Sequence, residues 1–405
     1  MRTRAKTGAA VTAALGVVGA AVWAGAGLFD AGGGGAAAQR LGPSARPPAL
    51  PGNGAGTSSE ARPFTLVATG DIIPYPSIVQ RAAQDAGGSG YDFRKILAGV
   101  KPLVSAADVA LCHHEIPYGP PGGPYTGYPT FKAPHQLADA LKDTGYDACS
   151  TASNHTLDAG YEGLVRTLDH LDRVGVGHVG SARSAEESRA PALLSAGGAR
   201  IAQLSYTYGT NGIPLPAGKP WAVNLIDKDR IVADARAARA AGAQVVVLSI
   251  HWGTEWQTAP DARQRELAQA LTASVTDGRP DIDLILGTHN HVPQPYERIN
   301  GTWVVFGMGD QVASFVPADK KRGNMSSVPR FTFAPSAAHP GRWEVVKAEY
   351  FTQYSDMGPP FRVVCTSCEG APQGRGDYAA VDRQVGEAVL SRGAGAQGLT
   401  RATRP

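Results

Sequence analysis

The sequence contains no dense run of Lys and Arg, and its charges nearly balance. It has 38 Lys and Arg against 35 Asp and Glu, which gives a net charge of +3. Domains that bind nucleic acid through its phosphates carry a basic patch or stripe. We therefore predict that nucleic acid is not a partner. No internal repeat is found either, which argues against a solenoid or a propeller.

Cysteine is scarce, with four in 405 residues, and none lies in the first forty, which excludes a lipid-modified N-terminal cysteine. Cys112 and Cys149 lie in apolar runs that predict buried strands. They form either a disulfide between neighbouring strands or two buried thiols. Cys365 and Cys368 have no second Cys or His pair at the spacing of a zinc site, so a local disulfide is predicted there.

The first forty residues predict export. Arg2, Arg4 and Lys6 precede the uncharged, mostly apolar stretch 8–29, a pattern typical of a signal peptide or an N-terminal membrane anchor. Residues 41–62 are rich in Gly, Pro and Ser and predict a disordered linker. We expect an extracytoplasmic protein, either secreted or, if the segment stays uncleaved, anchored to the outer face of the cell membrane.

Residues 63–369 predict one α/β domain, followed by a low-complexity tail, residues 370–405, with a helix near residues 380–390. Strand-like runs alternate with helix-like segments, which favours sheets covered by helices. The predicted strands are 64–71, 108–112, 148–152, 176–179, 200–206, 244–250 and 284–287, and the predicted helices begin at 77 or span 136–144, 161–174, 229–241 and 262–276. Beyond residue 300, the runs 303–306, 331–333 and 343–351 predict antiparallel strands.

Side chains that can bind a metal stand at the ends of five successive strand-like runs. They are Asp71, then His113, His114 and Glu115, then Asn154 and His155, then His251, and finally His289 and His291. In open α/β sheets ligands bind beyond the carboxyl ends of the strands, so these groups are predicted to face one crevice. Carboxylate, amide and imidazole groups without a thiolate suit Zn²⁺, Mn²⁺ or Fe.

His289 and His291 follow a strand in which alternate side chains point to opposite faces of the sheet. They converge on one site only if the chain bends, and Gly287 and Asn290 are predicted to provide that bend.

The order of these motifs resembles that of the calcineurin-like metallophosphoesterases. Segments 152–158, 249–255 and 289–295 are similar to the CapA branch (PGA_cap), the poly-γ-glutamate capsule proteins, and the resemblance covers residues 64–314. It implies a four-layer αββα sandwich with two divalent metal ions at the strand ends. It also implies a role in the synthesis, export or anchoring of poly-γ-glutamate or a related anionic envelope polymer.

The resemblance also implies a role for each site residue. Glu115 would bridge both metals, Asp71 and His291 would bind one of them, and the other would take Asn154, His251 and His289. His155 would act on the leaving oxygen of the substrate as a general acid or as a stabiliser of its charge, and Asp158 would orient its other ring nitrogen.

The first motif departs from the family pattern Asp-x-His, because the chain reads Asp71-Ile72-Ile73. His113 lies two residues before Glu115 on the same strand face and is predicted to supply an imidazole; otherwise the first metal binds weakly or through extra waters. Asp310, after the run 303–306, is a further candidate carboxylate.

Three functions remain open at this point. The chain is a CapA-type protein acting on an anionic polymer, an extracytoplasmic phosphoesterase acting on a phosphate ester, or a metal-stabilised scaffold that binds polymer without catalysis. A metal-dependent hydrolase is expected, although the fold alone does not establish an activity. Trp256 is predicted to rim the cleft, and Lys132 and Lys219 to meet an anionic substrate.

Overall fold

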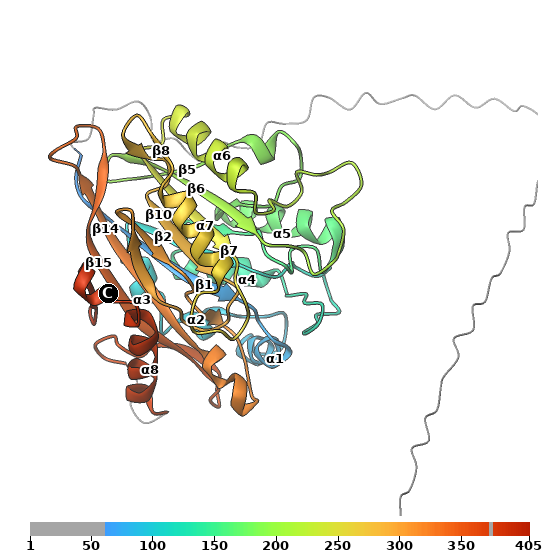
Figure 1. Ribbon diagram of the computed structural model, residues 1–405. Helices are drawn as coiled ribbons and strands as arrows, with labels where there is room; N and C mark the ends of the chain where they lie inside the picture. The colour runs from blue at the N-terminus through green and yellow to red at the C-terminus, as the bar shows by residue number, and fades with distance from the viewer. Residues whose placement is uncertain (1–60, 372–375) are drawn as a thin grey trace, which may run out of the picture. The chain divides into compact units, whose positions relative to one another are not determined.

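The computed structural model describes residues 61–371 and 376–405, and within them two β-sheets pack face to face (Figure 1). The predicted signal or anchor segment and the linker up to residue 60 lie outside the described residues. In the described part of the chain, no helix is both long and apolar enough to cross a bilayer.

The larger sheet has nine strands within the described residues and mixes parallel and antiparallel pairs. Its central strand β1 (Phe64–Ile72) pairs in parallel with β2 (Val109–His114) on one side and antiparallel with β14 (Met325–Pro335) on the other. The remaining strands are β3 (Ala148–Ser150), β4 (Gly177–Val179), β13 (Asp310–Val312), β15 (Trp343–Asp356), β16 (Arg362–Cys365) and β17 (Leu399–Arg401).

The smaller sheet has six strands in the order β11-β12-β10-β7-β6-β5, and β6, β7, β10 and β12 run in parallel. The strands are β5 (Ala192–Ala196), β6 (Ala199–Thr207), β7 (Val245–His251), β10 (Leu284–Thr288), β11 (Tyr296–Ile299) and β12 (Thr302–Val305). The predicted antiparallel closing strands are confirmed in both sheets.

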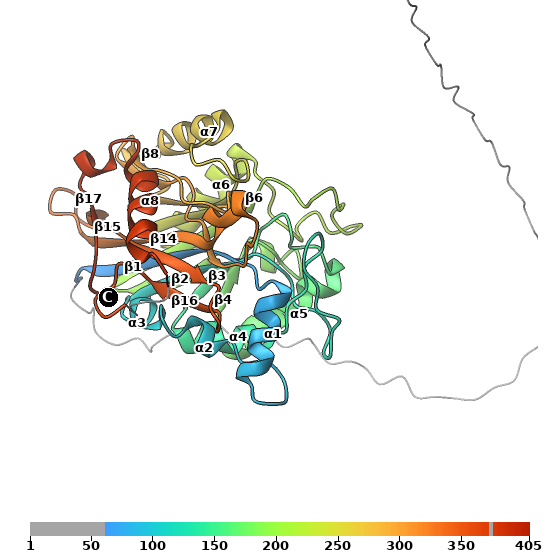
Figure 2. The same ribbon diagram turned by 90° about the horizontal axis from the view of Figure 1, so that it is seen from below.

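Helices cover the outer face of each sheet, so the layers follow the predicted αββα order (Figure 2). The larger sheet is covered by α1 (Pro76–Asp85), α2 (Arg94–Leu97), α3 (Lys101–Ser105), α4 (Gln136–Thr144) and α5 (Gly160–Val174). The smaller sheet is covered by α6 (Lys228–Ala240) and α7 (Ala262–Thr272). Helix α7 ends earlier than predicted, because residues 275–280 form the hairpin of β8 (Val275–Thr276) and β9 (Arg279–Pro280).

The core follows from the alternation of side chains along the strands. In β7, Val245 and Val247 pack between the two sheets, whereas Val246 and Leu248 pack against α6 and α7. A strand that is apolar on both faces needs cover on both faces, and the continuous apolar run of this segment is therefore typical of a central strand.

The C-terminal residues are part of the domain, so the prediction of a low-complexity tail from residue 370 is wrong for most of its length. The helix predicted near residues 380–390 is present as α8 (Tyr378–Leu390). Val381, Val385 and Val389 of α8 are buried in the core between the sheets, and β17 pairs in parallel with β15. The Gly and Arg content of this segment suggested disorder, whereas its valines recur at helical spacing and form an apolar stripe on α8.

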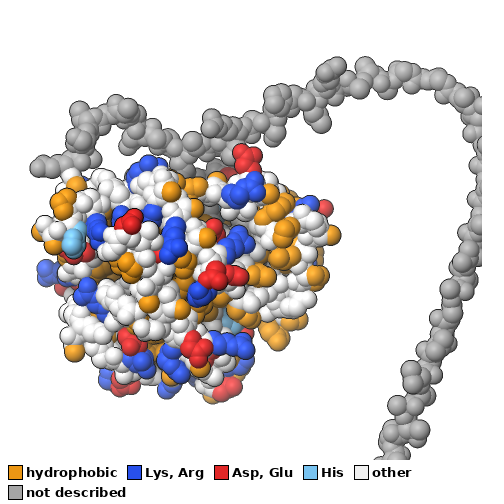
Figure 3. All heavy atoms as spheres, turned by 45° about the horizontal axis from the view of Figure 1, so that its top comes forward, with side chains coloured by type: hydrophobic (Ala, Val, Ile, Leu, Met, Phe, Trp, Pro, Cys, Tyr) orange, Lys and Arg blue, Asp and Glu red, His pale blue; other side chains and the backbone are white. Residues whose placement is uncertain are grey.

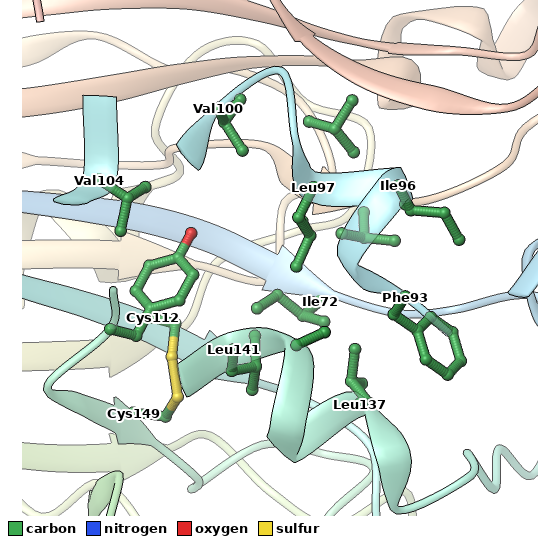
Figure 4. Packing of buried hydrophobic residues seen from close by; sticks show 14 of the residues in the cluster. Ile72, Phe93, Ile96, Leu97, Val100, Val104, Cys112, Leu137, Leu141 and Cys149 are labelled. Carbon is green, nitrogen blue, oxygen red and sulfur yellow. A yellow bond between two sulfur atoms is a disulfide. The ribbon is translucent and has the colours of Figure 1, made fainter. Parts of the chain in front are cut away.

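Both cysteine pairs form disulfides. Cys112–Cys149 joins the neighbouring parallel strands β2 and β3 at register partners, at the edge of the core beneath α4 beside Leu141 (Figure 4). Cys365–Cys368 closes a local loop after β16, as predicted. The first bond decides between the disulfide and the two buried thiols that the sequence left open.

We expect the Cys112→Ala/Cys149→Ala double variant to lose about 2–4 kcal/mol of unfolding free energy, because the bond constrains a long loop of the unfolded chain. The separation of its cysteines is 37 residues, against 3 for Cys365–Cys368. Urea unfolding of metal-free protein measures the loss. The Cys365→Ala/Cys368→Ala variant is the control and should lose less, so equal losses would contradict the loop-length argument.

The surface carries both signs of charge. On the face shown in Figure 3, Lys and Arg side chains lie among Asp and Glu side chains, and neither sign forms a continuous field. This agrees with the small net charge of the sequence.

Candidate metal centre

The carboxyl end of β1 places Asp71 at the centre of the site. Its side chain is fully buried, and Oδ2 accepts a hydrogen bond from the backbone N–H of His289 at 3.0 Å. Oδ1 has no hydrogen-bond partner among the described residues. A buried carboxylate oxygen without a donor is costly unless a cation or a proton compensates it.

The next strand, β2, brings His113 beside Asp71. The Nδ1 atom of His113 lies 2.8 Å from Ser150 Oγ, and Nε2 lies 3.7 Å from Asp71 Oδ1 without a hydrogen-bond partner. The ring stacks on that of His251 with 4.7 Å between centroids. His114 instead packs against Tyr118, 4.7 Å between centroids.

Glu115 follows β2 and is buried, with 1% of its surface exposed. Ser153 Oγ donates to its backbone carbonyl at 2.5 Å, which fixes the turn. Neither carboxylate oxygen has a hydrogen-bond partner in the described part of the chain, and Oε1 lies 3.9 Å from His251 Nε2. Two uncompensated oxygens at one buried carboxylate are the strongest sign of an ion site in this molecule.

Asn154 and His251 face each other across the two sheets. The Nε2 atom of His251 lies 2.8 Å from Asn154 Oδ1, and its Nδ1 lies 2.9 Å from Thr288 Oγ1. Helix α5 begins after Ala159, so Asn154 does not cap it. The amide oxygen of Asn154 is therefore directed at the imidazole instead of at a helix terminus.

The turn after β10 bends at the histidines themselves. His289 has φ 91° and His291 has φ 58°, whereas the sequence predicted that Gly287 and Asn290 would provide the bend. Left-handed backbone at two non-glycine residues is strained and is characteristic of functional sites. Gly287 serves another purpose, because a Cβ there would lie 2.1 Å from Phe306 O.

Asn290 stabilises this turn, since its Nδ2 donates to Trp252 O and to Thr254 O, both at 3.3 Å. The His289 ring lies 4.7 Å from the ring of His251 between centroids, and its Nδ1 has no hydrogen-bond partner within the described residues.

The general acid candidate forms a second cluster beside these groups. Nδ1 of His155 lies 2.6 Å from Asp158 Oδ2, which also accepts from the backbone N–H of Phe131 at 2.7 Å. Both side chains precede α5, so Asp158 is not in the first turn of that helix. The carboxylate selects the ring nitrogen that carries the proton and directs Nε2 away from itself.

Two groups of potential ligand atoms share Asp71. Within each group the ligand atoms lie within 4.8 Å of one another, and the groups are Asp71, His113, Glu115 and His251, and Asp71, His291 and Asp310. Asn154 adjoins the first group through His251. His289 belongs to neither group, although its ring lies between those of His251 and His291, 6.1 Å from the latter.

Burial sets the electrostatics of the centre. It raises the pKa of Asp71 and of Glu115 well above the usual carboxyl range, and the nearby Asp310 raises both further. It also lowers the pKa of His113 to about 3 and that of His251 well below its ordinary value. Without a cation the centre therefore favours neutral side chains, and a divalent ion would favour the ionised carboxylates.

We expect Mn²⁺ to raise the thermal unfolding temperature more at about pH 8 than at about pH 5. The folded pKa values of Asp71 and Glu115 are raised. These groups therefore favour folding of the metal-free protein below about pH 4, and this contribution is lost as the pH rises through the folded pKa. A bound cation offsets that loss. Scans with Mn²⁺ and with EDTA measure the difference, and a difference that shrinks as pH rises would contradict the prediction.

The mouth of the site is aromatic. Tyr208, which is 48% exposed, lies 4.5 Å from the His289 ring between centroids, and the Trp256 ring lies 5.2 Å from that of His291. Trp256 is therefore at the predicted rim. Lys219 packs over the rings of Tyr161 and Trp221 at 5.0 and 5.9 Å.

Several residues of the site carried little or no signal in the sequence. Ser150 and Thr288 hold the Nδ1 atoms of His113 and His251. Lys320 Nζ lies 4.6 Å above the Trp256 ring and provides a cation at the mouth. A hydroxyl in a strand is too common to single out, and Lys320 lies in η2 (Ala318–Asn324), where charged residues are ordinary.

Comparison with known proteins identifies a family. A sequence model described as "Bacterial capsule synthesis protein PGA_cap" matches residues 65–314. The PGA biosynthesis protein CapA of Bacillus subtilis is 30% identical over 183 residues, which are 42% of this chain and 44% of that protein. The capsule biosynthesis protein CapA of Bacillus anthracis is 24% identical over 183 residues, 44% of this chain and 43% of that protein. The chain thus matches less than half the length of either relative.

Among solved structures, the calcineurin-like phosphoesterase YfkN of Bacillus subtilis is similar with a TM-score of 0.44 and 16% identity. The match covers 82% of this chain and 98% of that chain.

Proposed function

The chain belongs to the PGA_cap family of bacterial capsule synthesis proteins, and we propose that it acts through a two-metal centre on an anionic envelope polymer. Poly-γ-glutamate, or a related polymer, is the proposed partner, and its synthesis or anchoring the proposed process. Its place would be the extracytoplasmic side of the cell membrane, in keeping with the basic and apolar N-terminal sequence. The CapA relatives are named for biosynthesis of PGA and of capsule.

The observation that carries the proposal is the pair of unpartnered oxygens of buried Glu115, set between Asp71 and His251. Such a carboxylate fits a ligand for divalent cations, and we infer that it bridges two of them. Glu115 lies in one group of ligand atoms with His113 and His251, and Asp71 is shared with the second group, which holds His291 and Asp310. The proposed ligands are Asp71, His113, Glu115, Asn154, His251, His289 and His291. Two bound Mn²⁺, Zn²⁺ or Fe ions would supply Lewis acidity for displacement at a phosphate or an acyl centre.

His155 is the proposed general acid. When the imidazole carries a proton on both nitrogens, Nδ1–H donates to Asp158 and Nε2–H would be the proton that a leaving oxygen needs. Phe131 packs edge-on against the ring, 4.9 Å between centroids, and limits its rotation. The acid is therefore held by a hydrogen bond on one side and an aromatic contact on another.

The charge at the mouth of the site favours an anionic substrate. Lys320 offers a positive charge above Trp256, which lies against His291. A polymer of carboxylates, or a phosphate ester, would gain from this charge and from the cations beneath it.

Metal analysis and an ester assay test the proposal together. The purified protein should contain about two equivalents of divalent metal, and His289→Ala should lower that content. Generic phosphate monoesters and diesters with Mn²⁺ or Zn²⁺ report turnover, which His251→Ala should abolish. Turnover of simple esters without any effect on polymer would favour a plain phosphoesterase, and polymer binding without turnover would favour a scaffold. Metal-free protein with unchanged stability on adding Mn²⁺ or Zn²⁺ would refute the centre.

A further inference from the structure

The family pattern leaves one ligand position unfilled in this chain. The first motif ends in Ile73 instead of histidine, and the Ile73 side chain is buried in the apolar core between the larger sheet and its helices. It offers no ligand atom. His113, which the sequence offered for this position, lies with Asp71, Glu115 and His251 and not with His291. The ion held by Asp71 and His291 therefore needs another donor.

A short strand from a distant part of the sequence reaches this position. β13 pairs in parallel with β1 and places Asp310 directly opposite Asp71. The backbone N–H of Asp71 donates to Gly309 O at 3.3 Å. The close approach requires glycine on both strands, because a Cβ at Gly70 would lie 1.7 Å from Gly309 O, and Gly309 has φ 77°.

The two oxygens of Asp310 have different surroundings. Oδ1 lies 3.0 Å from Nδ1 of His291, whereas Oδ2 is buried and has no hydrogen-bond partner in the described residues. The side chain is fully buried, and the ligand atoms of Asp71, His291 and Asp310 lie within 4.8 Å of one another. Two buried carboxylates converge beside an imidazole here, and in the described residues each has one oxygen without a hydrogen-bond partner.

We propose that Asp310 is a metal ligand that takes the place of the missing histidine. Oδ1 orients His291 while Oδ2 binds the ion that Asp71 and His291 hold. The inference rests on the proposed two-metal centre and adds a ligand to it.

An aspartate in place of the histidine changes the ligand types around the ion that Asp71 and His291 hold. With Asp71, Asp310 and the bridging Glu115, one ion meets three carboxylates and a single imidazole, whereas the other ion meets mainly imidazoles and an amide. Oxygen-rich positions favour Mn²⁺ and nitrogen-rich positions favour Zn²⁺. The Asp310 position should therefore take Mn²⁺ in preference to Zn²⁺ when both ions are offered.

The Asp310→Asn variant distinguishes two roles of Asp310: that of a metal ligand, and that of a residue that only orients His291. The amide oxygen still accepts from the ring N–H of His291, whereas the NH2 group takes the position of Oδ2 and offers the ion no lone pair. Metal-free full-length protein is titrated with MnCl₂, and bound Mn²⁺ is measured by equilibrium dialysis and by its electron paramagnetic resonance spectrum. The wild type should bind about two equivalents with a spin-coupled spectrum, and the variant about one with the spectrum of an isolated ion.

Asp158→Asn is the matched control, because it removes another buried carboxylate at the edge of the site and should leave both equivalents bound. Asp310→Asn protein that binds Mn²⁺ as the wild type does would overturn the ligand role while leaving the proposed centre intact. Wild-type protein that binds no Mn²⁺ would refute the centre itself.

If Asp310→Asn does not fold by circular dichroism, Asp310→Glu takes its place. The longer side chain keeps both oxygens but displaces them, so one equivalent should bind at least about 10-fold more weakly and the other as in the wild type. Unchanged affinity at both positions would overturn the proposal.

Discussion

Glu115→Ala is expected to reduce bound metal to one equivalent or fewer and to lower ester turnover by more than about 100-fold, beyond the range seen when only a hydrogen-bonded partner of a ligand is lost. The reason is the position of the carboxylate, which is buried between Asp71 and His251 with both oxygens unpartnered. Metal analysis and an assay at saturating Mn²⁺ measure the two effects.

The Glu115→Gln variant tests the same carboxylate without removing its side chain. The amide keeps the shape of the side chain, so the fold should survive, and it removes a group whose ionisation burial opposes. The metal-free variant should therefore unfold at a higher temperature than metal-free wild type, and Mn²⁺ should add little stability to it.

Glu255→Gln is the control for this pair of variants, since Glu255 is an exposed carboxylate beside the mouth and bonds to Trp256. It should leave the metal content unchanged. Wild-type metal content in Glu115→Ala would show that the carboxylate does not bridge.

Most of the candidate centre was predictable because each of its residues follows a strand with a clear apolar run. The run 245–250 is apolar throughout and is confirmed as β7, and the polar residue that ends it, His251, lies in the centre. Asp71 lies likewise at the carboxyl end of β1, and His113 at that of β2. A pattern of buried strands ending in ligand-type side chains is a local property of the sequence, and the fold brings such ends together.

The position of Asp310 in the centre could not be predicted from an apolar strand that precedes it. Its strand β13 has three residues, too few for a periodic signal, and its partner β1 lies more than two hundred residues earlier in the chain. The signal that was present is the Gly309 before it, which permits the close contact with β1. Only tertiary packing shows that this glycine and Gly70 face each other.

The bend of the last motif was predicted only in part, for a related reason. Asn290 lies in the bend as predicted, whereas Gly287 lies within β10, and the strained conformation falls on His289 and His291. Tertiary contacts impose it, because Asn290 is held by the carbonyls of Trp252 and Thr254, and the His289 N–H bonds to Asp71. A functional site can override the preference of each residue when its surroundings supply the stabilisation.

His155→Ala is expected to leave both metal ions bound and to lower kcat for phosphate esters by about 10²–10⁴-fold. The imidazole lies outside both groups of ligand atoms, its Nδ1 contacts Asp158, and it is not one of the proposed ligands, so its loss should remove no metal donor. It does remove the group that would protonate the leaving oxygen. Esters with a poor leaving group should lose more rate than esters whose leaving group needs no proton, and a series of aryl and alkyl phosphates measures that difference.

The Asp158→Asn variant tests whether Asp158 only positions His155, while His155 itself donates the proton. The carboxylate touches Nδ1 of His155 and the N–H of Phe131, so it acts through the imidazole and not on the substrate. Its replacement should cost less than the loss of His155 and should keep the same dependence on leaving group, because the acid remains but its tautomer is no longer fixed. If His155→Ala turns over alkyl phosphates as fast as the wild type, the imidazole is not the acid. If it loses metal as well as rate, His155 belongs to the ligand set and the assignment of Asp158 as its positioning residue changes with it.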